Sequence, residues 1–247
     1  DAEPVLRLET VDGQGIVDEG SATVESTRAE VTRVVKLVIE HARTRPTESL
    51  GVIALGLTNA QRIDDALRVA LVDVEDEVAD FLEESAPEPF FVKNLERVQG
   101  DERDAIILSV GYGKTPHGRV LHRFGPLNLE GGERRLNVAI TRARRRMTVV
   151  SALVAEDLDP ARLKARGAQM LRDFLAYAAS GGSARGHGAA PARALDPLVA
   201  DLADRLSSQG MAVHPGLGAS ADRIDLAVES LDAPGRLAVA VDFDGPE

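Results

Sequence analysis

Apolar residues along the first 180 positions alternate between a helical period and a strand period. Between Ser26 and Arg43 they recur every three to four positions, which predicts a helix that Pro46 closes. Segment 50–55 is short, apolar and β-branched, as is typical of a strand buried on both faces. The same pattern predicts further helices at 61–71, 75–84, 136–145 and 165–179, and strands at 90–92, 104–110 and 147–152. This alternation indicates an α/β fold, a parallel sheet with helices on both faces.

The pattern changes after residue 180. Gly, Ala and Ser dominate residues 181–195, which predicts a flexible linker. Beyond the linker, the pattern predicts a helix at 197–209 and short strands at 211–214, 224–228 and 237–241. An α+β unit this short buries little apolar surface alone. We therefore expect a first domain at 1–180 and, at 196–247, the truncated start of a second one.

Composition sets limits on the class of protein. The chain has 247 residues, of which 44% are hydrophobic, so a packed core is expected rather than a disordered chain. With no Cys there is no disulfide, thiolate metal site or Cys nucleophile. The five His residues show no metal-ligand spacing. No apolar run reaches the roughly 20 residues of a membrane helix, and no signal peptide pattern is present. We expect a soluble, cytoplasmic protein.

The formal net charge of −11 argues against a protein that coats nucleic acid with its whole surface. A local basic strip is still compatible with this charge, because residues 134–146 alone contain six of the 29 Lys and Arg residues. A second, smaller basic group comprises Lys93, Arg97 and Arg103. Either group is interpreted as a track for a phosphate backbone or as a solvated surface.

One apparent phosphate-binding motif is rejected. The sequence Gly113-Lys114-Thr115 follows a strand and ends as a P-loop does. A P-loop also needs a Gly where this chain has Leu108, inside the strand. Pro116 also disfavours the helix whose N-terminus would hold the phosphate. We interpret this segment as a surface turn.

Two other segments, 98–113 and 131–147, carry the strongest chemical pattern. In the second, Leu136, Ala139, Ile140 and Ala143 form an apolar helical face, while arginines follow another line. One interpretation is a solvated basic helix. The alternative is that a rigid element presents the planar fork of an Arg to a phosphate, which a mobile Lys does less well.

The two segments resemble motifs V and VI of superfamily 1 helicases, in the second RecA-like domain of the RNA-surveillance-like branch. Segment 98–113 has the Gln-Gly-x-Glu-x-Asp pattern at Gln99 to Asp104, and Asn137 to Arg144 reads Asn-Val-Ala-Ile-Thr-Arg-Ala-Arg. The segment 51–62, which ends in Gln-Arg, resembles a further strand-plus-loop element of the family. The resemblance covers roughly residues 20–180 and includes large bacterial helicase-related proteins that have a nuclease-like tail.

This resemblance implies a role in ATP hydrolysis. Arg142 would be the arginine finger that stabilises charge on the transferred phosphate, and Arg62 a second arginine at the same phosphate. Gln99, Gly100 and Glu102 would couple nucleotide to nucleic acid, with Glu102 toward the ribose. Arg144 would hold the nucleotide site in shape through a carboxylate.

Nucleic-acid contacts are implied at three further residues. The family has a Thr where this chain has Asn94, so the phosphate contact would come from Asn94 or from a backbone N–H. Arg97 lies in the smaller basic group. Tyr112 is an aromatic near the motifs, and base stacking is weighed against core packing for it. The expected ligand is single-stranded nucleic acid, with DNA favoured over RNA.

The Walker A and Walker B segments of the family are absent from this sequence. The Lys and Mg²⁺ ligands that they supply would belong to a first RecA-like domain of the full-length protein. ATP and Mg²⁺ would then be shared with that domain, and the present chain alone is not expected to hydrolyse ATP. The competing hypothesis is a non-catalytic interaction module that keeps the helicase fold.

The C-terminal residues carry a second resemblance. Segments 223–228 and 238–245 resemble a PD-(D/E)xK repair-endonuclease-like module with a restriction-endonuclease-like fold. It implies that Asp225 and Asp242 hold a Mg²⁺ ion across two strands, which would allow DNA cleavage. The alternatives are an inactive cleft or two ordinary strand-end residues.

Overall fold

The computed structural model describes residues 5–17, 23–82, 88–182, 197–217, 224–230 and 233–241. The chain divides into two compact units, residues 1–185 and 186–247. Most of the predicted linker, residues 183–195, lies outside the described residues. Within the described residues, no helix is both long enough and apolar enough to cross a membrane.

The first unit is built on a five-stranded sheet in the order β1-β5-β4-β2-β3. Every neighbouring pair in this sheet is parallel. The strands are β1 (Leu6–Thr10), β2 (Leu50–Ala54), β3 (Phe91–Asn94), β4 (Arg103–Ser109) and β5 (Ala143–Ser151). Since each crossover returns the chain to the amino end of the sheet, helices must run antiparallel to the strands. The predicted α/β class is confirmed.

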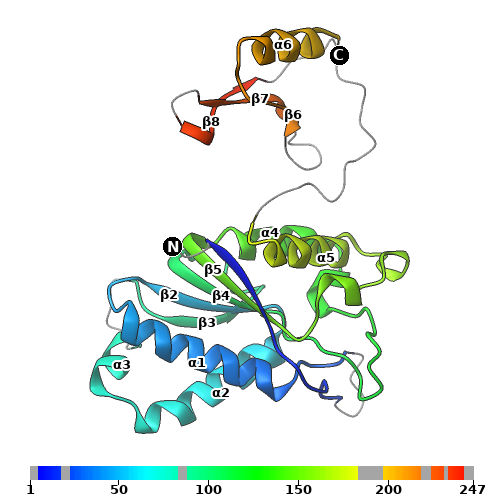
Figure 1. Cartoon of the computed structure of the whole chain (residues 1–247). Coiled ribbons are helices and arrows are strands. Elements are labelled where there is room, and N and C mark those ends of the chain that lie inside the picture. Colours follow the sequence, from blue (N-terminus) through cyan, green and yellow to red (C-terminus); the bar gives the residue numbers. More distant parts are fainter. Residues whose placement is uncertain are drawn as a thin grey trace. The chain divides into compact units, whose positions relative to one another are not determined.

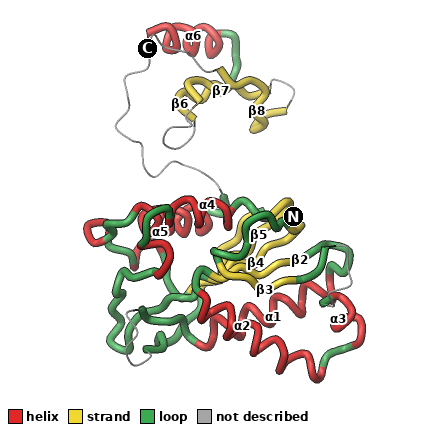
Figure 2. Tube along the Cα trace, turned by 180° about the vertical axis from the view of Figure 1, so that it is seen from behind, coloured by secondary structure: helices red, strands yellow, loops and turns green. Residues whose placement is uncertain are grey.

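Helices cover both faces of this sheet (Figure 1). They are α1 (Arg28–Thr44), α2 (Leu57–Ala70) and α3 (Asp76–Phe81) on one side, and α4 (Gly132–Ile140) and α5 (Arg166–Ala179) on the other. Figure 2 shows the same two layers from behind. The core has two parts: Val52 and Ile107 point toward α1 and α2, whereas Ile106 and Leu108 pack with α4 and α5. Alternate residues of one strand therefore pack on opposite faces of the sheet.

The α4–β5 boundary differs from the prediction. A helix over 136–145 was predicted, but α4 ends at Ile140 and β5 already begins at Ala143. The pairing of Ala143 with Arg103 starts the β4–β5 ladder at this point. Backbone pairing with two neighbouring strands therefore overrides the helical propensity of the arginine run. The edge strand β1 was not predicted.

Helices α4 and α5 cross at two glycines. A Cβ on Gly132 would lie 2.5 Å from the Leu127 carbonyl oxygen, and a Cβ on Gly167 would lie 2.4 Å from the same atom. No side chain fits at either position while the backbone stays in place. The two glycines therefore allow the starts of α4 and α5 to lie close to each other and to the backbone of Leu127.

The second unit contains α6 (Pro197–Ser208) and an antiparallel sheet in the order β6-β7-β8. Its strands are β6 (Val213–Leu217), β7 (Ile224–Ser230) and β8 (Ala233–Val241). Val199 and Ala203 of α6 pack on Leu226 of β7 in a small core. The predicted helix and three strands are present, although the strands are longer than expected.

Candidate functional site

Segments 98–113 and 131–147 meet where β4 and β5 begin. The backbone N–H of Arg103 donates to the carbonyl oxygen of Arg142 over 3.2 Å, so Glu102 and Arg142 are brought side by side. Arg103 itself is only 7% exposed. Its guanidinium donates to the carbonyl of Pro89 and lies 4.8 Å from the ring centroid of Phe91. Arg103 is therefore an anchor for this strand, and neither interpretation of this residue, a phosphate track or a solvated surface, fits its burial.

Arg142 lies directly after α4, with a side chain that is 19% exposed. Its Nε donates to the carbonyl oxygen of Val138 over 2.8 Å, and its Nη2 donates to the hydroxyl of Thr141 over 3.1 Å. Its Nη1 lies 3.6 Å from the Glu102 carboxylate, which is 51% exposed. The inner edge of the guanidinium is thus bound to the last turn of α4, while Nη1 faces an exposed carboxylate.

Arg144 is tied to carboxylates, as the sequence suggested. Its guanidinium forms ion pairs with Glu88 and with Asp104, the latter over 3.3 Å. The hydrogen bond from Arg144, together with a weaker one from Ser49, lowers the pKa of Glu88 to about 2. Burial raises the pKa of Asp104, but the Ser49 hydrogen bonds and the Arg144 charge outweigh burial and lower it. Arg144 therefore holds the start of β4 against the start of β5.

The turn before β4 carries the two remaining residues predicted to bind nucleotide. Gly100 is exposed and has a φ of 89°, in the left-handed region that favours glycine. Gln99 is also exposed and lines a groove of about 500 Å³. Arg134, Arg135 and Val138 of α4 line its other side. The groove therefore joins the Gln99 turn to the helix that ends beside Arg142.

The structure does not bring Arg62 to this place. Its Nη1 donates to the carbonyl oxygen of Ser26 over 3.2 Å, and the Ser26 N–H donates to the carbonyl of Gly111. Gly111 follows the carboxyl end of β4, whereas Arg142 lies at the amino end. The structure thus places Arg62 and Arg142 at opposite edges of the sheet, and their approach to the same phosphate stays a prediction.

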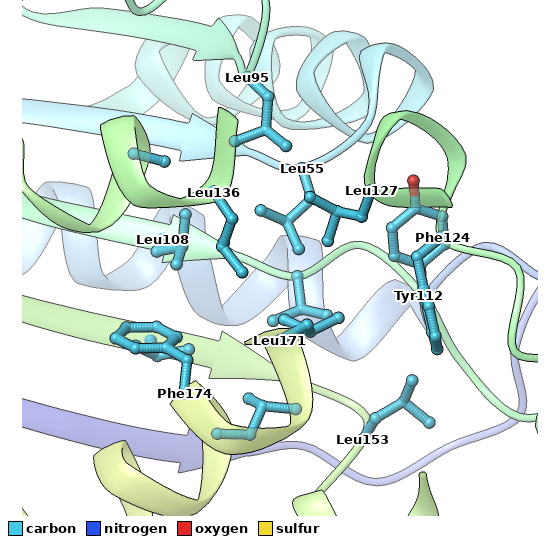
Figure 3. Close-up of a cluster of buried hydrophobic side chains, with 14 of the residues drawn as sticks. Leu55, Leu95, Leu108, Tyr112, Phe124, Leu127, Leu136, Leu153, Leu171 and Phe174 are labelled. Carbon is cyan, nitrogen blue, oxygen red and sulfur yellow. The ribbon is translucent and has the colours of Figure 1, made fainter. Parts of the chain in front are cut away.

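The residues predicted to bind nucleic acid have three different environments. Arg97 is exposed. Asn94 is only 6% exposed, so its side chain does not face solvent as a phosphate contact requires. Tyr112 is 4% exposed and packs edge-on against Phe124 with ring centroids 5.4 Å apart. Figure 3 shows the Tyr112 ring inside the apolar cluster, as the core-packing alternative expects. Burial also raises the pKa of the Tyr112 hydroxyl. Base stacking by Tyr112 is excluded in this conformation.

Sequence reasoning missed a buried carboxylate at the opposite edge of the sheet. Glu30 is 0% exposed and accepts hydrogen bonds from four donors. They are the Ser26 hydroxyl, the Ser109 hydroxyl at 2.6 Å, the Gly111 N–H at 2.7 Å and the Ala152 N–H at 3.2 Å. Burial raises the pKa of Glu30, although these donors offset part of the effect. Glu30 thus links the start of α1 to the ends of β4 and β5.

The predicted metal site of the second unit cannot be assembled from the described residues. Asp225 lies near the start of β7 and is partly exposed, while Asp242 falls outside the described residues. In the part of the chain that the structure describes, no group of three or more His, Cys, Asp or Glu side chains is placed to hold a metal ion. The nuclease-like site remains a prediction.

Comparison with known proteins identifies the family. A family model described as an AAA domain matches residues 2–153, more than half of the chain, so the chain belongs to this AAA domain family. Among curated proteins, it is similar to the uncharacterized ATP-dependent helicase MG140 of Mycoplasma genitalium, at 43% identity over 90 residues. The MG140 homolog of Mycoplasma pneumoniae is 44% identical over 87 residues.

The matched segments cover 36% and 35% of this chain but only 8% and 7% of these two relatives, so the chain spans a small part of their length. A solved structure, the C-terminal domain of a possible DNA helicase from Lactobacillus plantarum WCFS1, is 19% identical, with a TM-score of 0.35. The match covers 55% of this chain and 73% of that one, and at this score it supports no argument.

Proposed function

We propose that residues 1–180 form the second motor domain of an ATP-dependent superfamily 1 helicase or translocase. In the full-length protein it would pair with a first RecA-like domain that binds ATP and Mg²⁺. Arg142 would act as the arginine finger toward ATP, and Glu102 would lie toward its ribose. Single-stranded nucleic acid, with DNA favoured over RNA, would be the track.

The observation that carries this proposal is the pairing of Arg142 with Glu102 at one surface point where β4 and β5 begin. Two residues 40 positions apart in the sequence, each assigned to the nucleotide by a separate motif, lie 3.6 Å apart. The ion pair between Arg142 and Glu102 is partly exposed and longer than a hydrogen bond. It therefore opposes only weakly a movement of the Arg142 side chain from Glu102 to a phosphate. The similarity to ATP-dependent helicases supports the same function.

The residues present fit a nucleotide phosphate and sugar. Three of the five N–H donors of Arg142 are not used by the Val138 and Thr141 contacts. A guanidinium with free donors suits a phosphate, and an exposed carboxylate suits sugar hydroxyls. When bound, ATP with Mg²⁺ would supply the phosphoryl group that is transferred to water, and this domain would contribute positive charge and orientation.

The test uses the full-length protein with Arg142→Ala and Arg142→Lys. Nucleic-acid-stimulated ATP turnover should fall by roughly 10³-fold or more in Arg142→Ala, because an arginine finger contributes that much. Arg145→Ala is the matched control, since its side chain is 59% exposed and its ion pair among the described residues is with Glu48. Unchanged turnover in a folded Arg142→Ala protein would refute the finger role and favour the non-catalytic interaction module.

A further inference from the structure

Thr141 holds together the last turn of α4 and the side chain of Arg142. The Thr141 hydroxyl lies 3.0 Å from the carbonyl oxygen of Asn137 and 3.1 Å from that of Val138, so it donates to this end of the helix. The same hydroxyl oxygen accepts a hydrogen bond from Nη2 of Arg142 over 3.1 Å. Two helix-end carbonyls and one guanidinium thus share a single hydroxyl group, and the Asn137 carbonyl also accepts the backbone N–H of Thr141 over 3.2 Å.

The Val138 carbonyl is the second acceptor that holds the Arg142 guanidinium. It accepts from Nε of Arg142 over 2.8 Å, while Thr141 accepts from Nη2. Contacts at Nε and Nη2 fix both the position and the plane of the guanidinium, and they leave Nη1 directed toward Glu102 at 3.6 Å. An Arg side chain otherwise samples many rotamers, and ordering it costs free energy at the moment of binding.

We propose that Thr141 is a positioning residue that orients Arg142 for the phosphate of ATP. This inference rests on the proposed function of Arg142. A group held in its working orientation before the reaction contributes more to rate than a mobile one, because the ordering cost is already met. Thr141 acts only through Arg142 and need not touch the nucleotide.

A purely structural role for Thr141 predicts something different. Under the positioning role, stability should change little, because the Thr141 side chain is exposed and loss of its hydroxyl leaves no buried polar group unpaired. If the hydroxyl only ended α4, its removal would alter the unfolding temperature and leave turnover unchanged. The positioning role predicts the reverse.

The experiment compares Thr141→Val, Thr141→Ser and Arg142→Ala in the full-length protein. Thr141→Val keeps the side-chain shape without the hydroxyl, and kcat for ATP should fall roughly tenfold, the effect of one hydrogen bond lost in the transition state. KM for ATP should change less than about twofold, because ground-state contacts are kept. Thr141→Ser, which retains the hydroxyl, should restore most of kcat. Thr141→Ala serves as a second hydroxyl-free variant if the Val variant does not fold.

The double variant Thr141→Val/Arg142→Ala separates the explanations. If Thr141 acts through Arg142, the double variant should turn over as slowly as Arg142→Ala and no slower. Normal kcat in Thr141→Val together with impaired Arg142→Ala would overturn the positioning role and leave the proposed function standing. Normal kcat in Arg142→Ala would overturn both.

Discussion

The guanidinium groups of Arg62 and Arg142 lie at opposite ends of strand β4. Arg62 is bonded to Ser26, which pairs with Gly111 just beyond the last residue of the strand. Arg142 faces Glu102, directly before the first residue. A strand of seven residues spans about 20 Å. The two arginines therefore lie at different edges of the sheet, and the proposed nucleotide contact rests on the edge with Arg142.

This arrangement predicts different effects of the two arginines on ATP turnover. In the full-length protein, Arg62→Ala should lower kcat by less than about tenfold, since Arg62 lies at the other edge of the sheet from the phosphate contact that we propose for Arg142. Arg142→Ala should lower it by roughly 10³-fold or more. The measurement is steady-state ATP hydrolysis at saturating nucleic acid, with unfolding temperatures as a control for folding. Equal losses in the two variants would contradict the separation.

The buried Glu30 predicts a large effect on stability. Glu30→Ala leaves the N–H groups of Gly111 and Ala152 without their acceptor, and the free energy of unfolding should fall by about 3 kcal/mol. Glu30→Gln keeps one acceptor oxygen and should lose about half of that. Glu40→Gln is the control, because Glu40 is exposed on the same helix. Urea unfolding of the three variants measures the order of their free energies of unfolding. A Glu30→Ala variant as stable as wild type would show that the Glu30 hydrogen bonds do not stabilise the fold.

The same residue predicts a pH dependence. Burial raises the pKa of Glu30 in the folded state above its ordinary value of 4.5, so folding favours the protonated form. The stabilisation of the folded state by protonated Glu30 is fully present below pH 4.5. It is lost as the pH rises through the folded-state pKa of Glu30. The stability difference between wild type and Glu30→Gln should therefore shrink as the pH rises. A difference that grows over this range would show that the four donors outweigh burial.

Hydrophobic periodicity was sufficient for most of the fold. Strands such as β2 and β4 are apolar on both faces, and only a parallel sheet covered by helices buries such strands completely. The start of β5 was misassigned because Arg144 to Arg146 favour a helix when taken alone. Their strand conformation depends on pairing with β4 and β1, which are distant in the sequence.

The candidate site was only partly predictable. The motifs located Glu102, Arg142 and Arg144, because each belongs to a specific pattern at fixed spacing. Glu30 carries no such signal: an acidic residue in the first turn of a helix ordinarily faces solvent. Its burial follows from Ser109 and Ala152, residues that the sequence alone does not place nearby.

The pair formed by Arg144 and Glu88 predicts a measurable pKa change. The carboxyl pKa of Glu88 is about 2 in the folded protein because of the Arg144 hydrogen bond. In Arg144→Met it should return toward the ordinary Glu value of 4.5. Since the folded-state pKa is lowered, the stabilisation is present above the unfolded-state pKa and is lost as the pH falls toward 2. A carboxyl titration followed by NMR checks this, and an unshifted wild-type Glu88 would show that the ion pair does not persist in solution.

The crossing of α4 and α5 predicts that a single methyl group displaces the helix that carries the candidate site. Gly132→Ala and Gly167→Ala each place a Cβ within 2.5 Å of the Leu127 carbonyl oxygen, a backbone atom that cannot rotate away. Each should lower the free energy of unfolding by about 2–3 kcal/mol, the usual cost of overpacking. Gly56→Ala is the matched control, since its Cβ would lie 3.4 Å from the Tyr112 hydroxyl and should cost less than about 1 kcal/mol.

Because α4 ends beside Arg142, the two helix variants should also lower ATP turnover in the full-length protein while Gly56→Ala does not. Wild-type stability in Gly132→Ala would mean that α4 is not packed this closely on the backbone of Leu127.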